Sequence, residues 1–462
     1  MITNISKNKG ILLIDIMIAL SLSLLFIVAI TESSLIGRKV FDGAKNRNDL
    51  LDAFSGIVST TTIDIVSFSR PFGNDRIEII TKIKSFYDEV TFHEVISSNS
   101  TINASTPICS PFFANKNVIG NYQYIKEFDS NNIADVDSIE IKQITLPIDP
   151  LLLLTDIEVR NNIAYVSTDS ARASDPDILI FDIHEVQNPI LLSSVNTGPG
   201  IASVSIFGNK IYGSASSRIG QLHIIKLNSP NDISLINKFR LPLPYATATA
   251  PLGSSVFYDN NFVYLGTDKW DGSELSIIDI DDPMNPEVVG NFETGSKIND
   301  IFVHNNIAYI VASDQNQLRT IHVFDHSNPL LISSFSPTGW QRQEGKSISI
   351  FEDGLSLGRT PGGFNIIQDH EIFHWASTSN GVLNNMTSKD ISGGVYGIVL
   401  DKNNIYFITR TIDKELIIGN NDLSSLEYKY YSLPIAPKTI TCDSDRLYIL
   451  ANSAPIIYEI TF

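Results

Sequence analysis

The sequence predicts a mainly β protein in which a long N-terminal helix and a small strand-rich region precede a repetitive C-terminal domain. Two observations lead to this fold class: one strand motif recurs seven times after position 139, and an almost uncharged run occupies positions 11–30. Hydrophobic residues make up 43% of the 462 residues and charged residues 18%. We therefore expect most of the chain to fold, as more than one domain.

The repeats are best seen in two successive strands. The first apolar residue of the earlier strand recurs at an average spacing of about 47 residues, within the ~40–50 typical of propeller blades. These residues are Ile163, Ile211, Phe262, Ile307, Leu355, Ile405 and Leu447. The later strand reads ILIFDI from Ile178, LHIIKL from Leu222, LSIIDI from Leu275, IHVFD from Ile321, FNIIQD from Phe364, LIIGNN from Leu416 and PIIYEI from Pro455.

Further strands complete each repeat. Several repeats continue into Asn-Pro and another apolar stretch, which suits an outer edge because Pro cannot donate to a ladder. Four strands in each repeat predict a seven-bladed β-propeller over residues 139–462. The last repeat ends one strand short, and we expect the surplus strand at 139–147 to close the ring and remove an open edge. Six or eight blades are the alternatives, because the repeat at 346–381 is degenerate.

The repeat motif, (L/I)xI(I/F)DI followed by NPxxLxS, resembles LVIVD-repeat proteins, a propeller family of bacterial and archaeal cell surfaces. The match is clearest around Asp182, Asp279 and Asp325. The resemblance implies a fold and a location rather than an activity. We expect the repeated Asp to accept backbone hydrogen bonds at a strand end.

The apolar run at 11–30 is long enough to cross a membrane, since a helix of twenty residues spans roughly 30 Å. Lys7 and Lys9 predict a cytoplasmic N-terminus, with the remainder of the chain outside. A cleaved secretory signal would need a shorter apolar region. A plain anchor leaves Asp15 unexplained, because a carboxylate within an apolar run costs about 2.5–3.5 kcal/mol.

Lys9, Gly10 and Ile11, followed by the apolar run with Asp15, resemble the class III signal of type IV pilins and type II secretion pseudopilins. The resemblance implies that a prepilin peptidase cleaves between Gly10 and Ile11 and methylates the new N-terminus. It also implies that Asp15, where the family usually has Glu, pairs with the N-terminal amine of a neighbouring pilin or pseudopilin subunit.

The region after the membrane run has a simpler pattern. Apolar residues at helical spacing extend the predicted helix over 11–59, after a leader at 1–10. Strand-rich stretches at 61–68, 76–83 and 89–96 predict a small pilin-like α+β region over 60–116. Residues 117–138 form a predicted linker. Cys109 and Cys442 show no zinc spacing, and their pairing is left open.

One literal catalytic motif is present, HExxH at 370–374. Aligning FNIIQD with ILIFDI puts His370 and Glu371 level with His184 and Glu185, in a turn before a strand. Zinc chemistry needs both histidines on one face of a helix, and residues four apart in a strand are about 13 Å apart. We therefore predict no catalytic residue, metal or cofactor. Asp129–Asp137 lacks the central Gly of a calcium loop.

The formal net charge of −18 argues against nucleic acid as a partner, because binding to phosphates needs clustered Lys and Arg. Trp270, Trp340, Trp375 and Tyr245 lie in or near predicted loops and are candidate ligand contacts, with core packing as the alternative.

These features predict a minor pilin-like or pseudopilin-like protein of the cytoplasmic (inner) membrane, crossing once. Its propeller would be extracytoplasmic or on a pilus at the cell surface and would bind an unknown surface ligand as an adhesion head. The alternatives are a membrane-anchored extracytoplasmic propeller enzyme of hydrolase or lyase type, and a type II secretion minor pseudopilin with a structural role.

The first prediction concerns processing. Intact mass and N-terminal sequencing of the membrane-extracted protein should give a mature chain that starts at N-methylated Ile11. Gly10→Ala should leave the chain uncut, because cleavage follows that glycine in the resembling family. An uncut wild-type chain beginning at Met1 would reduce the apolar run to a plain anchor.

Overall fold

The computed structural model describes residues 139–462, apart from 170–171, 173, 338–342, 352–353, 361–369, 392, 402–403, 421–422, 424–427 and 444–445. It also describes the backbone of three earlier strands, β1 (Thr62–Ser69), β2 (Arg76–Lys84) and β3 (Glu89–Ser97). These form an antiparallel sheet of order β1-β2-β3 and begin and end within one residue of the predicted strands. The leader, the helix at 11–59 and the linker at 117–138, with Lys7, Lys9, Gly10, Ile11 and Asp15, lie outside the described residues.

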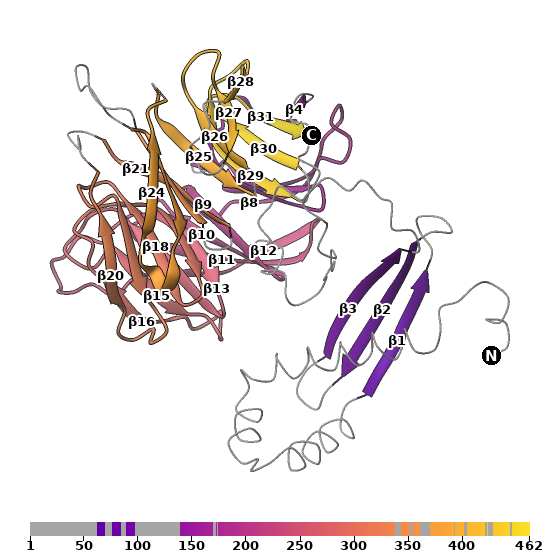
Figure 1. The fold of residues 1–462 in the computed structure, drawn as a ribbon. Coiled ribbons are helices and arrows are strands. Elements are labelled where there is room, and N and C mark those ends of the chain that lie inside the picture. The colour runs from indigo at the N-terminus through magenta and orange to yellow at the C-terminus, as the bar shows by residue number, and fades with distance from the viewer. Residues whose placement is uncertain are drawn as a thin grey trace, which may run out of the picture. The chain divides into compact units, whose positions relative to one another are not determined.

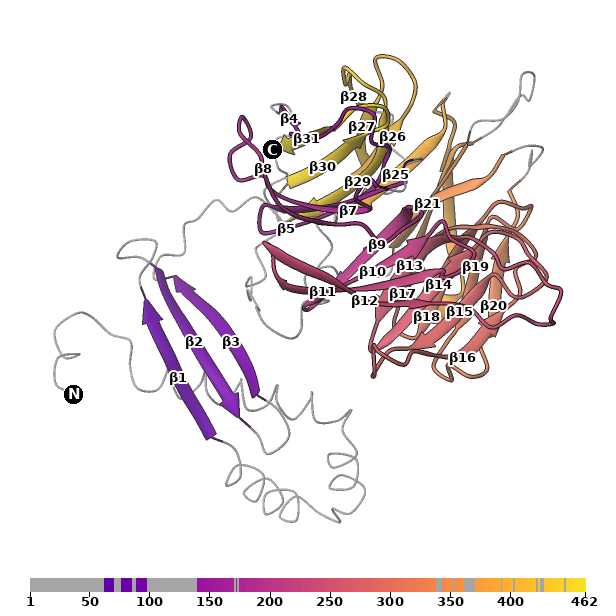
Figure 2. The same cartoon turned by 180° about the vertical axis from the view of Figure 1, so that it is seen from behind.

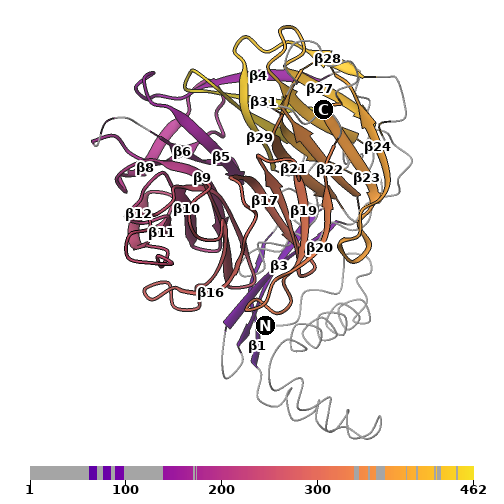
Figure 3. The same cartoon turned by 90° about the vertical axis from the view of Figure 1, so that its left-hand side faces the viewer.

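The C-terminal unit is a seven-bladed β-propeller, as the repeats predict (Figures 1 and 2). Each blade is a four-stranded antiparallel sheet. Figure 3 shows the first strands of the blades towards the middle of the ring and the fourth strands at its periphery. Each inner strand contacts the inner strand of the next blade, and the last, β29, contacts the first, β5.

The strands fall into four sets by their place in the blade. The inner strands are β5 (Leu154–Arg160), β9 (Ile201–Phe207), β13 (Gly253–Asp259), β17 (Ile298–His304), β21 (Gly345–Phe351), β25 (Val395–Leu400) and β29 (Pro437–Asp443). The second strands are β6 (Ile163–Thr168), β10 (Lys210–Ala215), β14 (Phe262–Thr267), β18 (Ile307–Ala312), β22 (Gly354–Arg359), β26 (Asn404–Thr409) and β30 (Arg446–Ala451).

The other two sets lie further from the axis. The third strands are β7 (Ile178–Asp182), β11 (Leu222–Ser229), β15 (Leu275–Asp279), β19 (Leu318–His322), β23 (Ile372–Ser377), β27 (Leu416–Asn420) and β31 (Ile456–Thr461). The outer strands are β8 (Ile190–Val195), β12 (Asp232–Phe239), β16 (Glu287–Phe292), β20 (Leu330–Phe335), β24 (Asn384–Lys389), β28 (Lys429–Tyr431) and β4 (Glu140–Thr145). A short 3-10 turn, η1 (Ser379–Gly381), precedes β24.

The seventh blade is built from both ends of the domain. β4 pairs antiparallel with β31, and Ile144 lies opposite Ile457. Both side chains are fully buried in one apolar cluster that also contains Ile157 and Leu179 of the first blade. The surplus strand predicted at 139–147 therefore takes the fourth place in the last sheet and joins it to the first.

Two-residue hairpins join the inner strands to the second strands in several blades. Asn161 and Asn162 both have positive φ, at 51° and 62°, and the Asn-Asn pairs at 260–261 and 305–306 do the same. Two successive residues with positive φ make the turn type that matches the twist of a hairpin, and Asn tolerates this conformation better than most residues.

Two third strands differ from the sequence prediction. In the fourth blade β19 begins at Leu318, three residues before the predicted start at Ile321. In the fifth blade the third strand is β23, which begins at Ile372. FNIIQD, the segment predicted for that place, lies within 361–369, outside the described residues. In both repeats the predicted strand was chosen by the Asp at its end, Asp325 or Asp369, and this Asp does not end the third strand.

The repeated Asp residues do accept backbone hydrogen bonds. Asp182 accepts from the N–H of His184 at 2.9 Å, and Asp279 accepts from that of Asp281 at 2.9 Å. Because β19 begins earlier than predicted, Asp325 lies in the turn after its strand, where it accepts from the N–H of Ser327 at 3.1 Å. Its role is structural, as predicted, but its position differs from that of the other two.

Among the described residues, no helix has the length and apolar character needed to span a membrane. The run at 11–30 lies outside the described residues.

Ring closure gives the second prediction. Ile144→Asp should lower the free energy of unfolding by about 3 kcal/mol or more, because it removes a buried side chain and buries an unpaired carboxylate. Gln143→Asp, on the exposed side of the same strand, should change it by only about 0.5 kcal/mol. Thermal or denaturant unfolding of the detergent-extracted full chain measures both. Equal effects would show that β4 does not close the ring.

Candidate functional site

One end of the ring, which we call the loop face, is formed by the loops that follow the second and fourth strands of each blade. In six blades the residue just before the third strand is a buried Asp, Glu or Gln. These residues are Asp177, Gln221, Glu274, Gln317, Glu371 and Glu415. Their position at the start of the third strand puts them under the loop face.

These buried side chains anchor the loops above them. In five blades a side-chain oxygen accepts the N–H of a residue just after the outer strand: Thr197, Leu241, Thr294, Ile391 and Leu433. We call this arrangement the loop anchor. Its signal in the sequence is one polar residue directly before the apolar third strand in six repeats, which the repeat motif above does not include. In the seventh blade Pro455 takes this place.

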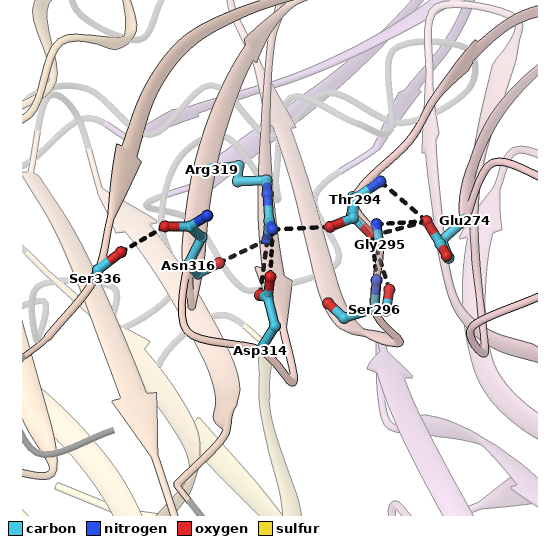
Figure 4. A network of polar contacts seen from close by, with 8 residues as sticks. All are labelled: Glu274, Thr294, Gly295, Ser296, Asp314, Asn316, Arg319 and Ser336. Atoms are coloured by element: carbon cyan, nitrogen blue, oxygen red, sulfur yellow. Dashed lines mark hydrogen bonds and ion pairs between the residues drawn. The ribbon is translucent and has the colours of Figure 1, made fainter. Parts of the chain in front are cut away.

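Figure 4 shows the anchor of the third blade and its link to the fourth. Glu274 accepts the N–H groups of Thr294 and Gly295, both at 2.9 Å. The carbonyl of Thr294 accepts in turn from the guanidinium of Arg319 at 2.9 Å, and Arg319 forms an ion pair with Asp314 at 2.6 Å. The network holds the loop between the two blades in one conformation.

The HExxH motif is a loop anchor with two structural histidines. Glu371 accepts the N–H of Ile391 at 3.0 Å, so it is level with Asp177 and Glu274 rather than with Glu185, as the sequence alignment had it. The motif still lies in a bend and a strand, as predicted. Burial raises the pKa of the Glu371 carboxyl to about 7.

The histidines bond elsewhere in the blade. His374 Nδ1 lies 2.9 Å from the Ser356 hydroxyl, and His370 Nδ1 lies 2.6 Å from the Ser388 hydroxyl. The other six blades have a buried Tyr where the fifth has Ser356: Tyr165, Tyr212, Tyr264, Tyr309, Tyr406 and Tyr448. His374 lies opposite Ser356 in the ladder, as Ile180 lies opposite Tyr165 in the first blade. Among the described residues, no three His, Cys, Asp or Glu side chains are grouped so as to hold a metal.

The inner strands bring two carboxylates near the axis. Asp156 accepts the N–H of Val204 in the next blade at 3.0 Å, and Asp300 accepts that of Ile348 at 2.9 Å. Both residues are partly buried in the inner strands β5 and β17. Burial raises the pKa of Asp156 to about 6, and burial, assisted by the charge of Asp156, raises that of Asp300 to about 7.

The predicted contact residues differ in their burial and in their contacts. Trp375 is 2% exposed and packs edge-on against Phe335 at 4.9 Å, so it is a core residue and not a surface contact. Trp270 covers its own turn, donating from Nε1 to the carbonyl of Ser273 at 3.0 Å. Tyr245 is half exposed and bonds to Asp271, beside Trp270. Trp340 lies outside the described residues.

The loops of the first three blades expose large apolar side chains on the loop face. Leu151 is 74% exposed, Leu153 56%, Ile219 72% and Tyr245 50%. Hydrogen bonds connect these loops: Asp169 donates from its N–H to the carbonyl of Leu153 at 2.9 Å and accepts from the Ser216 hydroxyl at 3.3 Å. We call these four residues the apolar arc. Exposed apolar groups on neighbouring loops are typical of interaction sites.

Cys442, in the inner strand β29, is disulfide-bonded. The only other cysteine of the sequence, Cys109, lies outside the described residues.

Comparison with known proteins supports the fold alone. No protein-family model matches the chain, and no curated protein matches its sequence. Virginiamycin B lyase from Staphylococcus aureus is similar in structure, with a TM-score of 0.53 and 14% identity over 70% of this chain and 100% of its own. A chain of a mitotic checkpoint complex gives 0.51 and 14%, over 72% and 98% respectively. The chain is thus a β-propeller protein.

The third prediction separates an anchor from a catalytic base. Glu371→Gln should keep the fold, because Gln has the same place in two other blades. Glu371→Ala should cost about 1–3 kcal/mol of unfolding free energy, since the N–H of Ile391 loses its acceptor.

The pH dependence of stability provides the readout. The pKa of Glu371 is higher in the folded chain than in the unfolded chain. Its contribution to the free energy of unfolding is therefore fully present below about pH 4.5 and is lost as the pH rises towards 7. Glu371→Gln should flatten the stability curve over that interval. An unchanged curve, or zinc binding lost in this variant, would contradict the structural role.

Proposed function

We propose that the chain is a minor pilin-like or pseudopilin-like protein that displays its propeller outside the cytoplasm as a binding head. The apolar arc carries the proposal of binding, because four large apolar side chains on loops of neighbouring blades have no structural need to be exposed there. The loop anchor of the second blade supports it. Gln221 accepts the N–H of Leu241 in the loop that carries Tyr245 and donates to the carbonyl of Ser217 in the loop that carries Ile219, so these two loops have less entropy to lose on binding.

Three features support the location. The order Lys9, Gly10, Ile11 and Asp15 resembles the prepilin signal. The disulfide at Cys442 suits an oxidising compartment, because disulfides are rare in the cytosol. A net charge of −18 suits an exported surface. On this proposal the partners are a prepilin peptidase, neighbouring pilin subunits, the membrane and a surface ligand.

A propeller enzyme is the second candidate, favoured by one observation. Asp156 and Asp300 have pKa values raised to about 6 and about 7, in the range of acid–base catalysts. Both carboxylates also accept backbone hydrogen bonds that stabilise neighbouring blades. The structural role accounts for their position, and the binding head is the function we favour.

The fourth prediction tests the binding head. The full chain, immobilised and screened against arrays of glycans and proteins, should retain at least one class of ligand. Leu151→Arg with Ile219→Arg should weaken that retention about tenfold, because charges would replace the apolar contacts. Ile190→Arg, which changes another exposed apolar residue, on the outer strand β8, is the matched control. Equal loss in both variants, or no loss in the first, would overturn the assignment.

A further inference from the structure

Two cations lie together on the loop face where the sixth and seventh blades meet. Arg410 follows β26, and its guanidinium carbon lies 4.0 Å from the ring centroid of Tyr396. The same guanidinium donates to Asn452 Oδ1 at 3.3 Å. The N–H of Asn452 donates to the carbonyl of Ala436 at 2.8 Å, two residues before Lys438. The Arg410 side chain is therefore fixed beside the inner strand that carries Lys438.

Within the described part of the chain, neither Arg410 nor Lys438 forms an ion pair, and Lys438 has no side-chain hydrogen bond. Burial, assisted by the charge of Arg410, lowers the pKa of Lys438. Two like charges in a partly desolvated place are costly, and a bound anion would relieve that cost.

The nearest carboxylates do not supply the missing charge. Asp156 directs its two oxygens to the N–H groups of Ile157 and Val204, at 2.9 and 3.0 Å. Asp169 accepts from the Ser216 hydroxyl in the second blade at 3.3 Å. Both carboxylates raise the pKa of Lys438 through their charge, but their hydrogen bonds go to other groups of the first and second blades.

We propose that Arg410, Lys438 and Asn452 form a binding site for one small anionic group, a carboxylate or a phosphate, at the loop-face end of the axis. The Arg410 fork can bond two oxygens of such a group, and its stacking on Tyr396 fixes the fork before binding. Lys438 adds a point charge, and the amide of Asn452 adds a donor. An extended polyanion does not fit, because a surface with a net charge of −18 would repel it.

The inference goes beyond the proposed function, because it holds for the isolated chain whatever anchors it and uses residues other than those of the apolar arc. Its test is the fifth prediction. Calorimetric titration of the full chain at low ionic strength should detect binding of glucuronate or of inorganic phosphate, and no binding of glucose, the neutral control. The stronger of the two anions identifies the group as a carboxylate or a phosphate.

Variants assign the binding to the site. Lys438→Gln and Arg410→Gln should each weaken the anion about tenfold, since each removes a charge-assisted hydrogen bond. Arg410→Lys should restore less than full affinity, because it keeps the charge but loses the fork. Lys269→Gln removes an exposed lysine from the loop face of the third blade and should leave binding unchanged. Melting temperatures check that each variant is folded.

Two results would overturn the proposal: no titration with either anion, or the same affinity in Lys438→Gln and Arg410→Gln as in the wild type. The variant Ile219→Arg, in the apolar arc, distinguishes the anion site from the proposed binding head. It should bind the anion as the wild type does, even if the screen for larger ligands fails.

Discussion

The pairing of β4 with β31 is the contact on which the rest of the propeller depends. The apolar clusters of this domain lie largely between adjacent blades, so each blade needs a neighbour on both sides to bury its faces. Closure by a strand from the other end of the domain gives the seventh blade its fourth strand and places Ile144 and Ile457 against Ile157 of the first blade. Without it, the apolar cluster shared by the seventh and first blades would lose Ile144, and β31 would be left as an open edge.

Closure fixes the inner strands, and the loop anchors then fix the loops. A buried Asp, Glu or Gln before the third strand satisfies a backbone N–H that would otherwise be unpaired under the loop face. This explains how a protease-like sequence can occur without protease geometry: Glu371 is present because the loop before β25 needs an acceptor. The loop face carries the apolar arc at the first three blades, and Arg410 with Lys438 where the sixth and seventh blades meet.

Sequence reasoning predicted the propeller and most of its strands, because period-two apolar runs, Asn-Asn turns and Asn-Pro edges are local signals. It misplaced the third strands of the fourth and fifth blades. In these two repeats the Asp of the motif does not mark the end of the third strand. It could not bring Arg410, Asn452 and Lys438 together, since their proximity depends on the packing of two blades around an axis. It could not decide between a ligand contact and core packing for Trp375, because the burial of this side chain depends on Phe335 of the blade before.

The proposed location of the propeller, on the outer side of the cytoplasmic membrane, is tested most directly by labelling of lysines. Cells with an intact cytoplasmic membrane are treated with a membrane-impermeant amine reagent, and modified peptides of the full chain are mapped by mass spectrometry. The account predicts that exposed Lys269 is labelled before lysis, while lysines of cytosolic proteins are not. Labelling of Lys269 only after lysis would place the propeller in the cytoplasm and contradict the account.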